Sequence, residues 1–289
     1  MAAQIIDGKY VSQLMENEVK RRIAHMLENN NPRPTLAAVL VGNNPASRIY
    51  LRNKSQACER VGINSKLIEL PEEATQSEIE ECIRNLNEDR YINGILVQLP
   101  LPPHLDEQKI IETINPLKDV DGLTSTNMGL LVKGIPRFVP CTPAGVMRAL
   151  SHYQINPHGM RAVIIGRSNI VGKPMALLLI HNNATVTVCH TKTQNLASIT
   201  SQADLLVVAV GRAGIITPDM IKPGAIVIDV GINRVPDNTT KTGYRVVGDV
   251  HTDAKDIASW VTPVPGGVGP LTVAQLLVNT IHAAELQNN

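Results

Sequence analysis

Residues 94–123, GILVQLPLPPHLDEQKIIETINPLKDVDGL, decide the fold class. An apolar strand over 94–99 precedes a helix over 105–114, and an Asp-Gly turn closes the stretch. The chain before it repeats this order: strands are predicted at 36–41 and 66–70, and helices at 11–29, 46–61 and, behind a capping box at Thr75, through Ile79, Ile83 and Leu86. Strands that alternate with helices of this length indicate an α/β protein with parallel sheets and right-handed crossovers.

The second half of the chain also alternates strands and helices. Its predicted strands are 162–165, 185–189, 205–210 and 225–230, and its predicted helices are 170–181, 196–201 and, after a Gly/Pro-rich loop, 273–287. Between the halves, residues 137–143 are predicted to form a hinge, with Thr142 capping a helix that reaches Tyr153.

Composition excludes several classes of protein. The 289 residues are 43% hydrophobic and 18% charged with a net charge of +1, so neither nucleic acid nor a membrane is an expected partner. No signal peptide and no spanning segment are expected, which favours a cytoplasmic location. The four cysteines and eight histidines follow no metal-ligand spacing. We therefore expect reduced thiols and no metal.

The helix over 46–61 carries a lysine in an unusual place. Ala46, Tyr50, Ala57 and Val61 form one stripe, and Lys54 falls inside it. Lys54 could simply extend from the edge of the stripe to water. Alternatively, it is an ammonium group partly desolvated beside the Tyr50 ring, and such groups exchange protons closer to neutral pH than groups in water.

Two polar residues follow the strand over 94–99. Gln98 faces away from Val97 and Leu99 at the carboxyl end of this strand, where ligands gather in α/β sheets, although it could instead cap a loop. In KDVDG one of the two aspartates could serve only to stabilise the turn. Asp121 is the better ligand candidate, because Gly122 is expected to leave room beside it.

The segment GRSNIVG (166–172) is the cofactor signal. It lies between a predicted strand and a predicted helix, and Ser168 or Asn169 could cap that helix so that its first amides face a pyrophosphate. The next strand ends in Cys189-His190-Thr191-Lys192 without the acid that NAD enzymes place on the ribose. With Arg167, this cationic surrounding favours NADP. A generic αβ unit with a solvated arginine is the alternative.

The loop PVPGGVGP (263–270) is rigid and allows close backbone approach. It is either a plain interdomain turn or a ligand contact, and its position ahead of a helix at a domain junction favours ligand contact.

Taken in order, the segments PASRIYLRNKSQACERVGI, GILVQLPLP, PLKDVDGL, PCTPAGV, GRSNIVGKP, IDVGIN, GDV and TPVPGGVGPLTV resemble bifunctional methylenetetrahydrofolate dehydrogenase/methenyltetrahydrofolate cyclohydrolase along almost the whole chain. The resemblance implies two α/β domains flanking a cleft, the second a Rossmann-like parallel sheet. Residues 1–138 would form the folate-binding catalytic domain, joined by a C-terminal helix over 271–289, and residues 139–270 the NADP-binding domain. A homodimer is the family's usual assembly, and the formyltetrahydrofolate synthetase domain of some relatives is not expected.

The resemblance also implies roles for individual residues. Tyr50 would stack on the folate, Lys54 would be the catalytic lysine positioned by Gln98, and Asp121 would hold the pterin. The further substrate contacts would be Val97, Leu99, Pro265, Gly266, Gly267, Val268 and Gly269. The cofactor contacts would be Gly166, Arg167, Ser168, Thr191 and Ile232.

The implied chemistry agrees with the residues. Oxidation of 5,10-methylenetetrahydrofolate expels a hydride without an enzymic base, whereas hydrolysis of the methenyl product to 10-formyltetrahydrofolate requires proton transfer, for which Lys54 is the candidate. Two alternatives stay open: a monofunctional dehydrogenase, which an intact Lys54 and Gln98 disfavour, and a non-catalytic dinucleotide-binding module.

Overall fold

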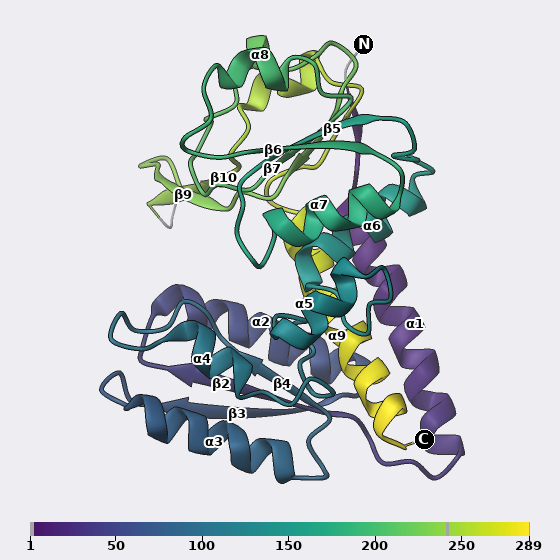
Figure 1. Ribbon diagram of the computed structural model, residues 1–289, viewed down its shortest axis with the longest axis vertical. Coiled ribbons are helices and arrows are strands. Elements are labelled where there is room, and N and C mark those ends of the chain that lie inside the picture. The colour runs from purple at the N-terminus through teal and green to yellow at the C-terminus, as the bar shows by residue number, and fades with distance from the viewer. Residues whose placement is uncertain (1–2, 241–242, 289) are drawn as a thin grey trace. The chain divides into compact units, whose positions relative to one another are not determined.

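The computed structural model describes residues 3–240 and 243–288. The chain divides into two compact units, Met1–Ser12 with Thr142–Thr272 and Gln13–Cys141 with Val273–Asn289. Each unit is built on a parallel sheet (Figure 1), so the predicted pair of α/β domains is confirmed. We call them the nucleotide unit and the catalytic unit, in that order.

The sheet of the catalytic unit has three parallel strands in the order β3–β2–β4. Its strands are β2 (Thr35–Val41), β3 (Asn64–Leu70) and β4 (Gly94–Val97), and its helices are α1 (Gly8–Glu28, from Gln13 on), α2 (Pro45–Val61), α3 (Gln76–Glu88), α4 (Glu107–Glu112), α5 (Ser125–Val132) and the later part of α9 (Val268–Asn288). Strand β2 is buried on both faces because its side chains alternate between two cores. Ala37, Val39 and Val41 pack with α3 and α4, while the even-numbered residues pack with α1, α2 and α9.

Local sequence signals explain how several of these helices begin and end. The predicted capping box is present: the Thr75 hydroxyl accepts from the Glu78 N–H, and the Glu78 carboxylate accepts from the Thr75 N–H. Helix α2 begins after Asn44, whose side chain caps its first turn, and ends at Gly62 in the left-handed conformation.

The predicted stripe on α2 is wrong in two positions. Ala46 and Tyr50 are exposed, and the buried side consists of Ser47, Leu51, Ala57, Cys58 and Val61. Lys54 still lies inside this stripe, three residues after Leu51 and four before Cys58, and its side chain is half-buried.

The nucleotide unit contains six parallel strands in the order β1–β11–β8–β7–β5–β6. These strands are β1 (Gln4–Ile5), β5 (Arg161–Ile165), β6 (Thr185–Cys189), β7 (Leu205–Val208), β8 (Ile226–Asp229) and β11 (Trp260–Val261). The helices are α6 (Cys141–His152), α7 (Gly172–His181) and α8 (Leu196–Thr200), with 3-10 turns η1 (Pro218–Met220) and η2 (Thr252–Asp256) and an antiparallel pair β9 (Asn233–Pro236) and β10 (Tyr244–Val247).

Three boundaries differ from the predictions. The N-terminal segment joins the nucleotide unit because β1 pairs with β11. Helix α6 begins at Cys141, so Thr142 lies inside its first turn, where its hydroxyl contacts that of Thr272 at 2.9 Å. Helix α9 begins at Val268, five residues early, because Pro270 is compatible with a first helical turn.

Candidate active site and cofactor site

Gln98 and Asp121 lie at the same edge of the catalytic sheet. Residues 118–120 run parallel beside β4, with Ile95 opposite Asp119 and the Ile95 N–H bonded to the Lys118 carbonyl at 2.7 Å. Gln98 follows Ile95 by three residues and Asp121 follows Asp119 by two. Both residues therefore sit at the carboxyl end of the sheet, where the sequence predicted ligand groups.

Lys54 reaches this edge from helix α2. Its Nζ donates to Gln98 Oε1 at 3.1 Å, and Gln98 Nε2 donates to the Leu99 carbonyl at 2.7 Å. Because the second bond fixes which end of the amide faces the lysine, Gln98 holds the ammonium group in place. The alternative in which Lys54 extends freely to water is wrong.

The two aspartates of KDVDG have different surroundings. Asp119 is buried and accepts from the N–H groups of Leu123 and Thr124, the Thr124 hydroxyl and the Asn127 amide, all between 2.8 and 3.1 Å. This carboxylate stabilises the turn. The Asp121 carboxyl lies beside the Cys141 thiol and within electrostatic range of the Lys54 ammonium group.

Burial raises the pKa of the Asp121 carboxyl, and the Lys54 charge acts in the opposite direction. Burial also raises the pKa of the Cys141 thiol well above its usual value, and the neighbouring Asp121 carboxylate adds to this rise. The thiol is therefore a neutral neighbour of Asp121. No sequence pattern indicated Cys141, because its contact with Asp121 joins segments twenty residues apart.

Gly122 has a different role from the one expected. Its φ is +70°, and an added Cβ would lie 3.0 Å from backbone atoms of Val139 and Pro140. A glycine is needed there so that the turn can pack against the segment before α6.

The remaining predicted contacts of the catalytic unit are close by in sequence. Tyr50 lies one helical turn before Lys54 on α2, with 40% of its surface exposed. Val97 is buried and ends β4, while Leu99 is half-buried and supplies the carbonyl that orients Gln98.

Gly166 lies at the switch point of the nucleotide sheet. From β5 the chain passes to β6 on one side and then crosses to β7 on the other. The φ of Gly166 is +119°, and a Cβ there would lie 2.3 Å from the Ala209 carbonyl oxygen that follows β7. Dinucleotides bind in this crevice of open α/β sheets, and only glycine allows the two backbones to approach so closely.

Ser168 caps a turn and remains a possible ligand donor. Its hydroxyl oxygen accepts from the N–H groups of Val171 and Gly172 at 3.2 and 3.4 Å, ahead of α7. The O–H is still able to donate to a phosphate. Asn169 does not cap; its side chain accepts from Lys173.

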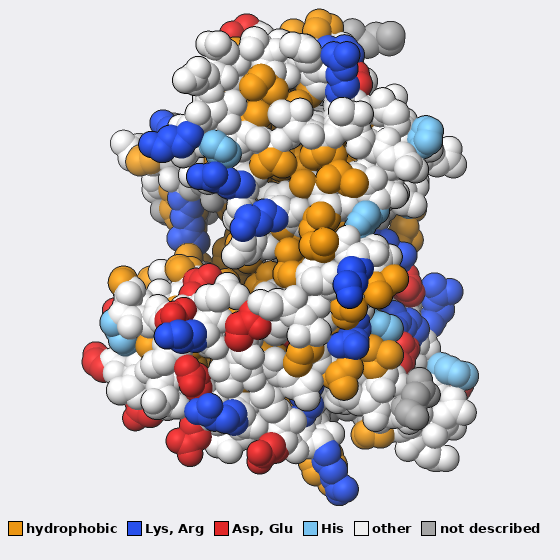
Figure 2. Space-filling model, viewed as in Figure 1, with side chains coloured by type: hydrophobic (Ala, Val, Ile, Leu, Met, Phe, Trp, Pro, Cys, Tyr) orange, Lys and Arg blue, Asp and Glu red, His pale blue; other side chains and the backbone are white. Residues whose placement is uncertain are grey.

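Arg167 and Thr191 occupy matching positions. Ile165 is opposite Cys189 in the parallel register of β5 and β6, and each candidate follows its strand by two residues. Both residues and Lys192 are exposed. The nucleotide unit as a whole has 12 Lys and Arg against 8 Asp and Glu, a net charge of +4. On the face drawn in Figure 2, acidic side chains gather over the unit that contains α3 and α4.

Ile232 follows β8 with 48% of its surface exposed, beside a buried carboxylate pair that the sequence analysis missed. Asp229 accepts from the N–H groups of Gly231, Asp249 and Val250 at 2.9 Å. Asp249 accepts from the N–H groups of Val210 and Gly211 and from the Asn233 amide at 2.7–2.9 Å. The two carboxylates therefore fix the loops that follow β7 and β8.

The residues predicted for the substrate loop are divided between a turn and a helix. Pro265, Gly266 and Gly267 form a turn in which the Gly267 N–H bonds to the Pro263 carbonyl at 2.8 Å, while Val268 and Gly269 lie in the first turn of α9. The Gly266 carbonyl accepts from the Lys9 N–H at 3.1 Å, so α1 supports this turn.

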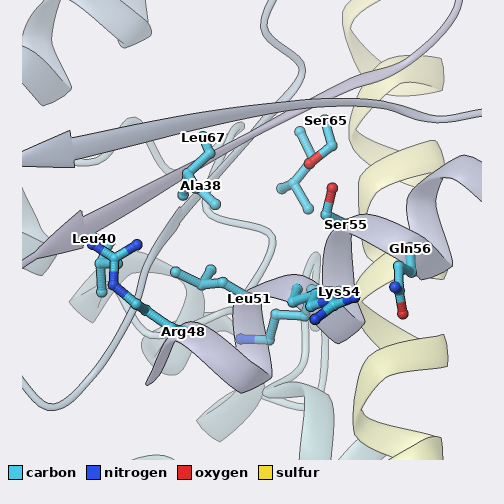
Figure 3. Close-up of a pocket in the computed structure, with 11 residues that line it drawn as sticks. Ala38, Leu40, Arg48, Leu51, Lys54, Ser55, Gln56, Ser65 and Leu67 are labelled. Atoms are coloured by element: carbon cyan, nitrogen blue, oxygen red, sulfur yellow. The ribbon is translucent and has the colours of Figure 1, made fainter. Parts of the chain in front are cut away.

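A groove of about 390 Å³, which Lys54 also lines, opens between α2 and strands β2 and β3 (Figure 3). It is lined by Leu36, Ala38, Leu40, Arg48, Leu51, Arg52, Lys54, Ser55, Gln56, Ser65 and Leu67. Gln98 and Asp121 are absent from this lining, so we do not assign the groove to the substrate.

Within residues 3–240 and 243–288, three or more His, Cys, Asp or Glu side chains nowhere gather in a way that could hold a metal. Over the same ranges, no helix is long and apolar enough to cross a bilayer.

Comparison with known proteins agrees with this geometry. The family model of the tetrahydrofolate dehydrogenase/cyclohydrolase catalytic domain matches residues 6–121, and that of the NAD(P)-binding domain matches residues 140–288. The chain is 52% identical to the bifunctional protein FolD 2 of Bordetella pertussis over 286 residues, 99% of both chains.

Solved structures give the same result. The bifunctional FolD enzyme of Campylobacter jejuni superimposes with a TM-score of 0.94 and 46% identity over 99% of both chains. The FolD enzyme of Trypanosoma brucei, solved with NADP and an inhibitor, has a TM-score of 0.96 and 39% identity over 100% of this chain and 99% of its own. The family predicted from the sequence motifs is confirmed: this chain belongs to the tetrahydrofolate dehydrogenase/cyclohydrolase family.

Proposed function

We propose that this protein oxidises 5,10-methylenetetrahydrofolate to 5,10-methenyltetrahydrofolate with NADP and then hydrolyses the product to 10-formyltetrahydrofolate, a one-carbon donor of the kind used in purine synthesis. The observation that carries the proposal is the Lys54–Gln98 hydrogen bond of 3.1 Å at the sheet edge that also holds Asp121. A monofunctional dehydrogenase would not need a lysine held in this way.

The site residues have different roles in binding and catalysis. Asp121 accepts the paired donors of the pterin, its amino group and ring N–H, and Tyr50 stacks on the substrate. Val97 and Leu99 complete the substrate contacts of the catalytic unit. In the hydrolysis, water attacks the cationic methenyl carbon and loses a proton, and Lys54, oriented by Gln98, transfers protons in this step.

The nucleotide unit would hold NADP, which accepts the hydride from the substrate carbon when it is bound. Gly166 allows the pyrophosphate to approach the backbone, and Ser168 donates its hydroxyl. Arg167 and Thr191 would contact the 2′-phosphate, and Ile232 would be a further cofactor contact. The crevice at the switch point and the net charge of +4 support this assignment.

A spectrophotometric assay tests the proposal. Purified protein, 5,10-methylenetetrahydrofolate and NADP should yield NADPH, and the methenyl intermediate should decay faster than in buffer alone. NADPH formation without accelerated hydrolysis would indicate a monofunctional dehydrogenase. Nucleotide binding without any turnover would indicate a binding module.

We also propose a homodimer, formed through β3. This strand is an edge of its sheet, Leu67 on it is 50% exposed, and the apolar groove lies beside it. A second copy would cover both. Light scattering after size exclusion should give a dimer for the wild type and a monomer for Leu67→Glu.

A location in the cytoplasm is proposed on the four free cysteines of the described chain.

A further inference from the structure

Two buried amides on helix α9 lie beneath the Asp121 turn. Gln275 and Asn279 are 8% and 5% exposed, and Gln275 Nε2 donates to Asn279 Oδ1 at 2.9 Å. This bond fixes which end of the Asn279 amide points away from Gln275. Both hydrogens of Asn279 Nδ2 are then directed at the chain that packs against α9.

Those hydrogens reach two segments that are distant in sequence. Asn279 Nδ2 donates to the Val120 carbonyl at 2.8 Å and to the Val139 carbonyl at 3.1 Å. It also lies 3.7 Å from the Cys141 sulfur, and the Cys141 thiol donates to the same Val120 carbonyl at 3.5 Å. One side chain therefore ties the residue before Asp121 to the segment that carries the thiol beside Asp121.

Asp121 depends on these ties for its position. Its neighbour Asp119 is fixed by four hydrogen bonds, but the pairing of residues 118–120 with β4 ends before Asp121. Gly122 then packs against Val139 and Pro140, the segment that Asn279 holds. A shift of the segment at Val120 or of the segment at Val139 would therefore move the Asp121 carboxylate.

We propose that Asn279, oriented by Gln275, is a positioning residue that sets the Asp121 carboxylate for the folate, so that the C-terminal helix takes part in substrate recognition without touching the substrate. This inference rests on the proposed role of Asp121. Without the Asn279 amide, the Val120 and Val139 carbonyls lose a buried hydrogen-bond donor, and the turn that carries Asp121 relaxes.

Asn279→Leu, which keeps the approximate volume but removes both donors, tests the inference. Its matched control is Gln287→Leu on the same helix, because Gln287 Nε2 likewise donates to two carbonyls, of Asn93 at 2.8 Å and Leu117 at 3.1 Å, without contacting the Asp121 turn. Asn279→Leu should raise the KM for folate about 10- to 100-fold in both reactions and leave the KM for NADP within about twofold. Gln287→Leu should leave both KM values near wild type.

Three further variants make the outcome unambiguous. Asp121→Asn should raise the folate KM by itself, and adding Asn279→Leu to it should cost much less than Asn279→Leu costs alone, because the two residues act through one contact. If Asn279→Leu does not fold, Asn279→Ser, which keeps one donor, should raise the folate KM several-fold.

The two proposals fail in different ways. A normal folate KM for Asp121→Asn would overturn the role of Asp121 itself. A raised KM for Asp121→Asn with a normal KM for Asn279→Leu or Asn279→Ser would overturn the positioning role alone. Equal losses toward folate and NADP, matched by Gln287→Leu, would also overturn it, because Asn279 would then only stabilise the fold.

Discussion

Each unit of this protein places a pair of aspartates at the carboxyl end of its parallel sheet, and the two pairs are used differently. In the nucleotide unit, Asp229 and Asp249 each accept three hydrogen bonds from the protein itself. In the catalytic unit, Asp119 accepts four, whereas the described neighbours of the Asp121 carboxyl are the Cys141 thiol, the Lys54 charge and the Asp119 carboxylate. The occupied carboxylates fix loops, and the proposed role of Asp121 is to bind the substrate.

This difference separates activity from stability. Substitutions in the catalytic corner of Lys54, Gln98 and Asp121 should change kinetics more than the free energy of unfolding. Substitutions in the Asp229–Asp249 corner should do the reverse. The following four predictions test that separation.

Lys54→Met should have the largest effect. Hydride transfer gives no proton to the protein, so dehydrogenase activity should remain measurable, although lowered by weaker positioning. Cyclohydrolase activity should fall by ~10²–10⁴-fold, as is typical for loss of a general acid–base group. Steady-state assays of both reactions on one preparation, with folding checked by circular dichroism, measure the two effects.

Lys54→Arg is the matched control for charge. It should restore little of the cyclohydrolase activity, because a guanidinium does not deprotonate near neutral pH. An equal loss of both activities in Lys54→Met would mean that the lysine only positions the substrate.

Several regular elements have the bounds or the caps that the sequence predicted. The strand at 185–189 has the bounds predicted, and the capping box at Thr75 begins its helix as expected. Gln98 and Asp121 were found because strand ends in α/β sheets are predictable from apolar runs.

What the sequence could not predict depends on contacts between distant segments. The two-residue strands β1 and β11 exist only because they pair with each other and with β8. Cys141 and Asn279 meet the Asp121 turn through tertiary packing, and the occupied state of Asp119 depends on Asn127, eight residues away. The shift of the α2 stripe has the same origin, because α1, α9 and the sheet decide which side of that helix is buried.

Asp229 should give the stability of the nucleotide unit a pH dependence. Burial raises the pKa of this carboxyl from an ordinary 3.8 to about 6, so between these values the native state binds a proton more tightly than the unfolded chain. The free energy of unfolding should therefore fall as the pH rises from about 4 to about 6, by up to about 3 kcal/mol.

Asp229→Asn cannot titrate and isolates this contribution. Urea unfolding should be measured for the wild type and the variant at pH 4 and pH 7. The free energy of unfolding of the variant, relative to that of the wild type, should be higher at pH 7 than at pH 4 by up to about 3 kcal/mol. A constant difference across this range would mean that Asp229 does not titrate there.

Arg167→Ala tests an exposed residue of the nucleotide unit, in contrast to the buried pair Asp229 and Asp249. A charge-assisted contact with the 2′-phosphate should make kcat/KM roughly ten- to a hundredfold higher with NADP than with NAD. The variant should lose most of that ratio with little change in NAD-linked activity. If the ratio is unchanged, the phosphate is held elsewhere, and Lys192→Ala becomes the informative variant.

Asp121→Asn decides the comparison between the aspartate pairs. The amide keeps the shape of the side chain but leaves one pterin donor unpaired, which costs about 1–3 kcal/mol of binding free energy. Since Asp121 anchors the substrate and not one chemical step, the folate KM should rise by a similar factor in both reactions. The free energy of unfolding should hold or increase, because the variant removes a carboxyl whose pKa is raised by burial. Asp119→Asn is the counterpart and should destabilise the fold. The new amide nitrogen would face N–H or O–H groups that now donate hydrogen bonds to the carboxylate. Equal destabilisation by the two variants would mean that Asp121 is a structural residue like its neighbour.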